Sequence, residues 1–365
     1  MSSFPSFAYL LPTGRCNLNC TGCYATLEQF GRNSRKGELT IEEYRKVVCE
    51  LYEMGVRTFD ISGGEPMLYP HLTALCETIK QYKETRIWLI TNGTANSVEK
   101  LRALEKLVDR LVFSLDAPTP TLHDQLRGSR GAFAKTVEMI RAARLMRFEE
   151  VAVNFVVSRP NIAAAGAMLE FASKHVDRVA FLTFRDVSEN GVFYNLIPRL
   201  PELREMWQTI ATALERNSRP KLVDLVSPAF LFPETTAFRR TLPPQLRNRI
   251  ELHHPHLRGH SAFHKTIVVK PFGTLCGDTA MVNNALFEIG SARDGVAEVW
   301  QAESARWRAR LAERQTALRT EGFCRDCSRW HVCRGGCPAA ALHQWSDFMK
   351  HDRSCESFRE KGDFK

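Results

Sequence analysis

Six strand-like apolar segments alternate with helical segments over the first half of the chain, and this alternation constrains the fold more than any other feature. One helical stretch, and no tight hairpin, separates each segment from the next, so the strands must run parallel with right-handed crossovers. Six units over about 180 residues are too few for a complete eight-unit barrel, so the pattern predicts an α/β fold with a partial (βα)6 barrel. The segments are residues 7–12, 56–62, 87–93, 111–117, 151–158 and 179–184.

Polar and glycine-rich motifs lie at or just after the ends of three of these strands, where the loops of a parallel sheet build a site. Gly63, Gly64, Glu65 and Pro66 come after the second strand, Asn92 lies at the end of the third, and Ser114 and Asp116 lie at the end of the fourth. The paired glycines let a ligand approach the backbone closely, and the glutamate adds a negative charge. The same four residues also suit an ordinary turn.

Three cysteines, Cys16, Cys20 and Cys23, lie in the loop after the first strand with the spacing C-x3-C-x2-C. Three thiolates on one loop can bind three irons of a cubane cluster and leave the fourth iron without a protein ligand. An electron carrier or a structural zinc site would require a fourth ligand close by. The next cysteines, Cys49 and Cys76, are predicted to be buried small hydrophobic residues.

The cysteine triplet and the GGEP sequence together resemble the signature of the radical S-adenosylmethionine (radical SAM) superfamily. The resemblance implies that the amino and carboxylate groups of S-adenosylmethionine chelate the open iron of a [4Fe–4S] cluster, and that GGEP binds the amino group. It implies that Ser114 contacts the ribose and that Arg127 pairs with the cofactor carboxylate. The alternative interpretation of Arg127 is an ordinary surface arginine. Asp116 either assists Ser114 or caps the next turn, and Asn92 offers hydrogen bonds to a sugar or a carboxylate.

The adenine subsite departs from the family pattern. Many members carry an aromatic residue just before the third cysteine, where this chain has Gly22. Adenine packing is therefore expected from Tyr24, from Phe184 or from elsewhere.

The C-terminal tail contains a second cysteine cluster with the spacing C-x2-C-x5-C-x3-C, followed by a further cysteine eighteen residues later. Zinc is the alternative occupant of such a site. The tail resembles the SPASM extension of radical SAM maturases, which holds auxiliary iron–sulfur clusters. The resemblance implies at least one auxiliary [4Fe–4S] cluster, with Cys324, Cys327, Cys333 and Cys355 as its ligands.

A second auxiliary cluster would use Cys337 together with upstream cysteines, of which only Cys276 is present. His260 or His264 is a possible substitute ligand, and the alternative is that Cys276 and Cys337 are free. Relatives that oxidise peptides place an aspartate beside the upstream cysteine, which makes Asp278 the first candidate for a general base. Hairpin-turn chemistry is the competing interpretation of Asp278.

Three domains are predicted: the radical SAM partial barrel at 1–185, a connecting segment at 186–260 and the SPASM-like domain at 261–365. The strand–helix alternation is expected to stop in the connecting segment, which is a candidate region for substrate recognition. The stretch 253–264 contains five histidines at irregular spacing and is predicted to be a surface loop.

Composition favours a cytoplasmic metalloprotein. Eleven cysteines, an odd number, without a secretion signal argue for metal ligation rather than disulfides. No apolar run is long enough to span a membrane. The net charge of +9 comes with scattered arginines, which favours a solvated surface over a nucleic-acid interface.

The resemblance implies reductive cleavage of S-adenosylmethionine to a 5′-deoxyadenosyl radical, with the electron coming from an external flavodoxin- or ferredoxin-like donor. An auxiliary cluster favours net oxidation, such as dehydrogenation or crosslinking of a peptide or protein side chain. The alternatives are a small-molecule dehydrogenase or epimerase acting on a sugar or an antibiotic precursor, with Cys276 as hydrogen donor, and a non-enzymatic iron–sulfur or zinc module. Because the chain begins at the barrel, a leader peptide would be bound by a separate protein, or the substrate would bind directly.

Overall fold

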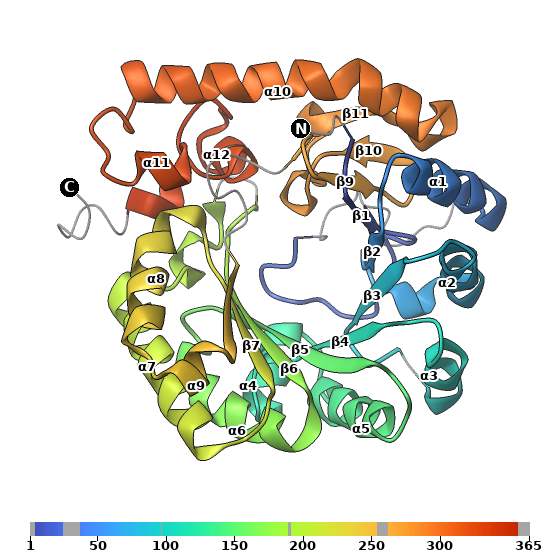
Figure 1. Ribbon diagram of the computed structural model, residues 1–365, viewed down its shortest axis with the longest axis vertical. Helices are drawn as coiled ribbons and strands as arrows, with labels where there is room; N and C mark the ends of the chain where they lie inside the picture. Colours follow the sequence, from blue (N-terminus) through green and yellow to red (C-terminus); the bar gives the residue numbers. More distant parts are fainter. Residues whose placement is uncertain (1–3, 25–36, 96, 189–190, 254–261, 357–365) are drawn as a thin grey trace. The chain divides into compact units, whose positions relative to one another are not determined.

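The computed structural model describes residues 4–24, 37–95, 97–188, 191–253 and 262–356 and divides into two compact units (Figure 1). Unit 1 comprises Met1–Ser114, Arg127–Val151 and Ser261–Ala309, and unit 2 comprises Leu115–Leu126, Ala152–His260 and Arg310–Lys365. Both units are assembled from separate stretches of the chain. They do not follow the three predicted domain boundaries, and that division stays a prediction.

Unit 1 contains a sheet with the strand order β11-β10-β9-β1-β2-β3-β4. Strands β9, β1, β2, β3 and β4 run parallel, and β9, β10 and β11 are antiparallel neighbours, so β9 and β10 form a hairpin around residue 272. The strands are β1 (Phe7–Leu10), β2 (Thr58–Ile61), β3 (Arg86–Thr91), β4 (Arg110–Ser114), β9 (Thr266–Val269), β10 (Thr274–Cys276) and β11 (Glu288–Ser291). The helices are α1 (Ile41–Glu53), α2 (Leu72–Lys80), α3 (Val98–Leu104) and α5 (Ala132–Arg144).

Helix α1 shows how local sequence sets these boundaries. Thr40 and Glu43 form a reciprocal capping box, which satisfies backbone donors at the start of the helix. Tyr44, Val47 and Leu51 then recur at helical spacing and are buried.

Unit 2 contains four parallel strands in the order β5-β6-β7-β8. They are β5 (Glu150–Val157, of which the first two residues belong to unit 1), β6 (Arg178–Thr183), β7 (Leu222–Val226) and β8 (Ile250–His253). The helices are α4 (Pro120–Arg127), α6 (Ala165–His175), α7 (Leu200–Arg216), α8 (Phe232–Thr241), α9 (Pro244–Arg247), α11 (Trp330–Cys333), α12 (Pro338–Trp345) and the second half of α10 (Val296–Thr320).

Strands β7 and β8 correct the expectation that the strand–helix alternation stops after residue 186. Helix α7 follows β6, and β7 and β8 then continue the parallel sheet. The sequence pattern did not predict these two strands because each is short and carries a charged residue among its apolar ones, Asp224 in β7 and Glu251 in β8. His253 ends β8, whereas His254, His256 and His260 lie outside the described residues.

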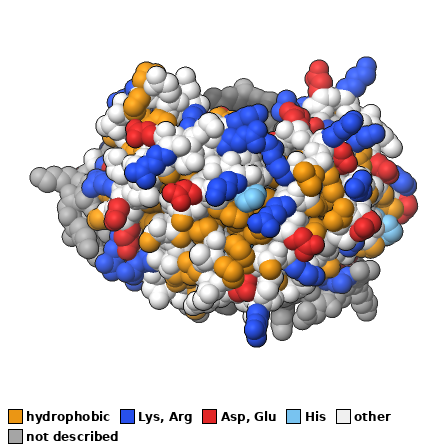
Figure 2. Space-filling model, turned by 90° about the horizontal axis from the view of Figure 1, so that it is seen from below, with side chains coloured by type: hydrophobic (Ala, Val, Ile, Leu, Met, Phe, Trp, Pro, Cys, Tyr) orange, Lys and Arg blue, Asp and Glu red, His pale blue; other side chains and the backbone are white. Residues whose placement is uncertain are grey.

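The described helices include none that is both long and apolar enough to cross a membrane. On the face drawn in Figure 2, Lys and Arg side chains are interspersed with acidic and hydrophobic ones rather than gathered in one stripe. This distribution agrees with the expectation of a solvated surface.

Strand register places Tyr9, Asp60, Trp88 and Arg110 in one row on the same face of the unit 1 sheet. Their neighbours along the strands, such as Phe59, are fully buried on the opposite face. The Arg110 guanidinium lies 4.3 Å from the Trp88 ring centroid. The row therefore forms a polar and aromatic inner layer of the sheet.

Burial of the Asp60 carboxyl group in this layer is energetically unfavourable. The residue is 5% exposed, and its Oδ1 has no hydrogen-bond partner within the described part of the chain. Burial raises the pKa of Asp60 to about 7, although a hydrogen bond to Ser62 and the charge of Arg110 act in the opposite direction. The folded protein therefore keeps this carboxyl protonated at pH values where the unfolded chain has already lost the proton.

We expect the free energy of unfolding to decrease as the pH rises from about 4 to about 7, because the unfolded state binds fewer protons than the folded state in that window. The Asp60 contribution should be on the order of 1–4 kcal/mol. Urea denaturation at pH 5 and pH 8 measures it, with Asp60→Asn as the comparison, since the amide does not titrate. An equal pH dependence in the two proteins would contradict the assignment.

Candidate functional site

The loop after β1 brings Cys16, Cys20 and Cys23 together with polar groups from other segments of unit 1. The backbone N–H of Leu18 donates to Cys16 Sγ at 3.5 Å. Asn92 Nδ2 lies 3.8 Å from Cys16 Sγ, and Arg127 Nη1 lies 3.8 Å from Cys20 Sγ. Three half-buried thiols with donors aimed at the sulfur atoms fit a cubane cluster, because hydrogen bonds to sulfur stabilise the negative charge of such a centre.

Gly63 and Gly64 allow the cysteine loop to pack directly on the segment after β2. A Cβ atom on Gly64 would lie 2.2 Å from the carbonyl oxygen of Arg15, and one on Gly63 would lie 2.9 Å from that of Thr13. Backbone hydrogen bonds join the same segments, from Gly64 N to Thr13 O at 2.9 Å and from Glu65 N to Arg15 O at 2.7 Å. The two glycines therefore allow the backbone of the cysteine loop itself, and not only a ligand, to lie close to this segment.

Glu65 is 1% exposed, and both of its carboxylate oxygens accept hydrogen bonds from the chain. Thr91 Oγ1 and Met67 N donate to Oε1 at 2.7 and 3.0 Å, and Asn92 N donates to Oε2 at 2.7 Å. Burial raises the pKa of Glu65, and these hydrogen bonds oppose that shift. The carboxylate thus ties the end of β3 to the 3-10 turn η2 (Pro66–Leu68), which begins at the predicted Pro66.

Asn92 and Arg127 both lie against the cysteine loop. Besides approaching Cys16, Asn92 Nδ2 donates to Asn17 Oδ1 at 3.0 Å, and its Oδ1 accepts from Thr94 N at 2.7 Å. The contact between Arg127 and Cys20 places this arginine at the loop rather than on an open surface. Sequence reasoning missed Asn17, although its position inside the cysteine motif was a usable signal.

Three further predicted cofactor residues lie near the ends of strands. The Tyr24 hydroxyl donates to the Gly63 carbonyl at 3.5 Å. Ser114 is the half-buried last residue of β4. In unit 2, Asp116 Oδ1 accepts from Val156 N of β5 at 2.9 Å, so this carboxylate supports a neighbouring strand.

The β9–β10 hairpin of unit 1 carries Cys276 and Asp278. Cys276 is fully buried, its thiol lies 3.6 Å from the Asp278 carbonyl oxygen, and burial raises its pKa to about 12. Asp278 Oδ1 accepts from Ala280 N at 2.9 Å and caps the 3-10 turn η7 (Thr279–Met281). This cap is the turn chemistry that competed with the general-base interpretation, and the catalytic role of Asp278 stays a prediction.

The two other predicted core cysteines differ from each other. Cys76 is fully buried, as expected. Cys49 is only half-buried, with its thiol 3.6 Å from Glu53 Oε1, so the prediction of burial was wrong for this residue. The reason is that Cys49 lies beside the buried stripe of α1 and not in it.

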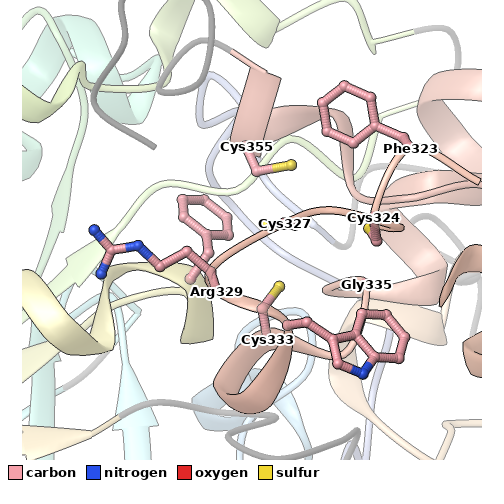
Figure 3. A pocket seen from close by; sticks show the side chains of 9 residues that line it. Phe323, Cys324, Cys327, Arg329, Cys333, Gly335 and Cys355 are labelled. Carbon is pink, nitrogen blue, oxygen red and sulfur yellow. The ribbon is translucent and has the colours of Figure 1, made fainter. Parts of the chain in front are cut away.

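Four tail cysteines line one small pocket in unit 2, together with aromatic side chains and Arg329 (Figure 3). Figure 3 shows the sulfur atoms of Cys333 and Cys355 directed into the same space, with Cys324 beside it. A set of four thiols suits an iron–sulfur cluster or zinc. The lining residues are Phe230, Phe323, Cys324, Cys327, Arg329, Trp330, Cys333, Gly335 and Cys355.

Cys337 does not line this pocket. It is 2% exposed and precedes α12, and its backbone N–H donates to Asp352 Oδ2 at 3.3 Å. Cys337 belongs to unit 2 and Cys276 to unit 1, and a second auxiliary cluster on these two residues stays a prediction.

The family comparison bears on the first of these sites. A family model described as the radical SAM superfamily matches residues 10–172, a stretch that contains the cysteine loop, GGEP and Arg127. Residues 10–172 thus form a radical SAM domain. Members of that superfamily bind S-adenosylmethionine and a [4Fe–4S] cluster, which confirms the predicted cofactors of this domain.

Two characterised relatives are similar to the radical SAM region. One is the antilisterial bacteriocin subtilosin biosynthesis protein AlbA of Bacillus subtilis (strain 168), 33% identical over 35% of this chain and 28% of its own length. The other is an AdoMet-dependent heme synthase of Methanosarcina barkeri, 33% identical over 47% of this chain and 48% of its own length. The chain therefore matches less than half of either relative.

The fold extends beyond the radical SAM region. The crystal structure of Streptococcus suis SuiB bound to the precursor peptide SuiA superimposes with a TM-score of 0.72 and 17% identity, covering 97% of this chain and 76% of SuiB. This likeness includes the cysteine-rich C-terminal part. The predicted fold class, a partial radical SAM barrel with a SPASM-like C-terminal domain, is confirmed.

We expect Gly64→Ala to remove the radical SAM cluster selectively, because the new methyl group would collide with the Arg15 carbonyl and displace the cysteine loop. Iron should fall from about eight to about four atoms per chain after anaerobic reconstitution, since the tail cysteines are untouched. Gly55→Ala is the control: Gly55 has a positive φ of 101°, which Gly64 lacks, and a Cβ there meets nothing within 4 Å, so this variant strains the backbone without a collision. Equal iron contents in the two variants would contradict this role of Gly64.

Proposed function

We propose that this chain oxidises a side chain of a peptide or protein by radical SAM chemistry, most simply by dehydrogenation or crosslinking. With the cluster on Cys16, Cys20 and Cys23 reduced, bound S-adenosylmethionine supplies a 5′-deoxyadenosyl radical that takes a hydrogen atom from the substrate. The observation that carries the proposal is the four-cysteine pocket of Cys324, Cys327, Cys333 and Cys355 in a chain that also has a radical SAM domain.

The residues of unit 1 hold the reactants in this proposal. Gly63 and Gly64 present backbone groups to the cofactor amino group, Ser114 contacts the ribose, and Tyr24 packs on the adenine. Asn92 and Arg127 stabilise the negative charge of the cysteine-bound centre through their contacts with Cys16 and Cys20. Glu65 positions Asn92 through its backbone N–H.

Electron balance favours oxidation over a redox-neutral rearrangement. The substrate loses one hydrogen atom to the radical, which becomes 5′-deoxyadenosine, and then one electron and one proton. The electron goes to the auxiliary cluster of the tail cysteines, and the proton goes to a base, for which Asp278 is the first candidate. An external flavodoxin- or ferredoxin-like protein supplies the electron that starts each turnover.

Known proteins of similar sequence or fold support a peptide substrate. AlbA is named for bacteriocin biosynthesis, and SuiB was crystallised with a precursor peptide. Recognition of a leader segment would fall to a separate binding protein or to the 186–260 region. The eleven cysteines form no disulfide within the described residues, which supports a reducing, cytoplasmic setting.

A small-molecule oxidation or epimerisation is the second candidate, and the heme synthase relative favours it. In an epimerase, Cys276 would return a hydrogen atom to the substrate instead of an electron leaving through the tail cluster. A non-enzymatic iron–sulfur or zinc module is the third. The deuterium content and mass of the product distinguish the first two, and cofactor cleavage tests the third.

We expect the reconstituted protein to form 5′-deoxyadenosine under dithionite, and the Cys16/Cys20/Cys23 triple-alanine variant to form none above background. A Cys324→Ala/Cys327→Ala variant should still cleave the cofactor, because the first cluster is intact, but should not complete substrate oxidation. Liquid chromatography with mass spectrometry measures 5′-deoxyadenosine in each protein. Synthetic peptides encoded by neighbouring reading frames serve as substrates, and the expected product is lighter by two hydrogen atoms.

Other outcomes separate the alternatives. Deuterium gained at carbon from D2O, without loss of mass, would replace oxidation with epimerisation. Absence of 5′-deoxyadenosine in the wild-type protein would leave only a binding module.

A further inference from the structure

The guanidinium group of Arg314 is buried against the wall of the tail-cysteine pocket. Arg314 lies in the second half of α10 and is 2% exposed. Gly335, which lines the pocket, has no side chain between them: a Cβ there would lie 3.3 Å from Arg314 Nη1. The arginine therefore approaches the pocket from behind the Gly335 backbone.

Every hydrogen bond of Arg314 goes to a backbone carbonyl of the cysteine-rich tail. Nη2 donates to Gly335 O at 2.8 Å and to Lys350 O at 2.7 Å, and Nη1 donates to Gly336 O at 3.3 Å. Nε donates to Phe348 O at 2.6 Å and to Lys350 O at 3.2 Å. The side chain thus joins the glycine pair before Cys337 to the segment that leads to Cys355.

No carboxylate of the described residues forms an ion pair with Arg314, although a buried charge normally requires a partner. Two other largely buried arginines of unit 2 illustrate the rule: Arg329 pairs with Glu234, and Arg178 pairs with Asp224 at 2.6 Å. The nearby carboxylate of Asp352 accepts hydrogen bonds from Ser354 N at 3.0 Å and from Cys337 N. Asp352 therefore acts on the positive charge of Arg314 without forming an ion pair with it.

The tail thiols and the Asp352 carboxylate are the sources of negative charge around Arg314. Burial lowers the pKa of Arg314, and negative charge on Cys337, Asp352, Cys333 and Cys324 opposes that shift. Four thiolates bound to a cubane cluster give a centre with a net negative charge that grows when the cluster is reduced. A fixed positive charge in a low-dielectric setting therefore stabilises the reduced form more than the oxidised form.

We propose that Arg314 is the charge partner of the auxiliary cluster and raises the midpoint potential of that cluster, so that it accepts the electron left on the oxidised substrate. Arg314 is a positioning residue and touches no substrate in this scheme. The inference rests on the auxiliary cluster of the proposed function.

An EPR-monitored redox titration tests the proposal in the full-length Cys16/Cys20/Cys23 triple-alanine protein, where only the auxiliary cluster gives a signal. Arg314→Gln should make reduction at least tenfold less favourable, a fall of about 59 mV for one electron. Arg310→Gln is the matched control, because it removes one charge from α10 a single turn away, and Arg310 contacts the Phe348 ring rather than the glycine pair. It should shift the potential by less than half as much.

Arg314→Lys keeps the proposal testable if the glutamine variant fails to bind iron. A buried lysine loses its proton far more readily than arginine, so the midpoint potential of this variant should fall between pH 6 and pH 10 by at least the same tenfold equivalent. The parent protein should show no such fall. A constant potential in the lysine variant, or equal potentials for Arg314→Gln and the parent, would overturn the proposal.

The same experiment separates this inference from the proposed function. If the parent protein holds iron in no second cluster, the proposed oxidation fails, and the role of Arg314 fails with it. If the cluster is present but its midpoint potential is the same in the parent protein and the Arg314 variants, only the inference about Arg314 is wrong.

Discussion

The radical SAM site depends on the buried carboxylate of Glu65. Its two oxygens accept hydrogen bonds from Thr91, Asn92 and Met67, and so they fix the end of β3 against the turn that follows β2. The Glu65 backbone N–H meanwhile donates to the Arg15 carbonyl in the cysteine loop. Glu65 therefore connects three segments of unit 1. Its hydrogen bonds position the polar groups that face the sulfur atoms.

The glycines beside Glu65 make this connection possible. At Gly64 the backbone of the cysteine loop occupies the space where any side chain would begin. A second close approach occurs at Gly128, where a Cβ would lie 2.2 Å from the Asn19 carbonyl, directly after Arg127. The cysteine loop is thus held between two glycine-containing segments, which explains how a short loop can present three thiols in a fixed arrangement.

The two sulfur sites differ in how the protein balances their charge. In unit 1, Asn92 from a buried position and Arg127 from a half-buried one reach the sulfur atoms directly at 3.8 Å. In unit 2, the Arg314 guanidinium is fully buried and lies behind the backbone of Gly335. A centre that must leave one iron open needs an accessible loop, whereas a centre bound by four cysteines can be enclosed, with its charge balanced from within the core.

The sequence by itself determined the strand–helix alternation and both cysteine groups, because periodicity and spacing are local properties of the chain. The resemblance carried by the first cysteine group and GGEP indicated the radical SAM superfamily. Only the tertiary structure decided that Glu65 connects three segments and that Asp116 supports β5. It also decided that Cys337 does not line the tail-cysteine pocket and that β7 and β8 extend the sheet. These features depend on which groups meet across distant segments and how far water is excluded there, and neither property is encoded in the spacing of residues along the chain.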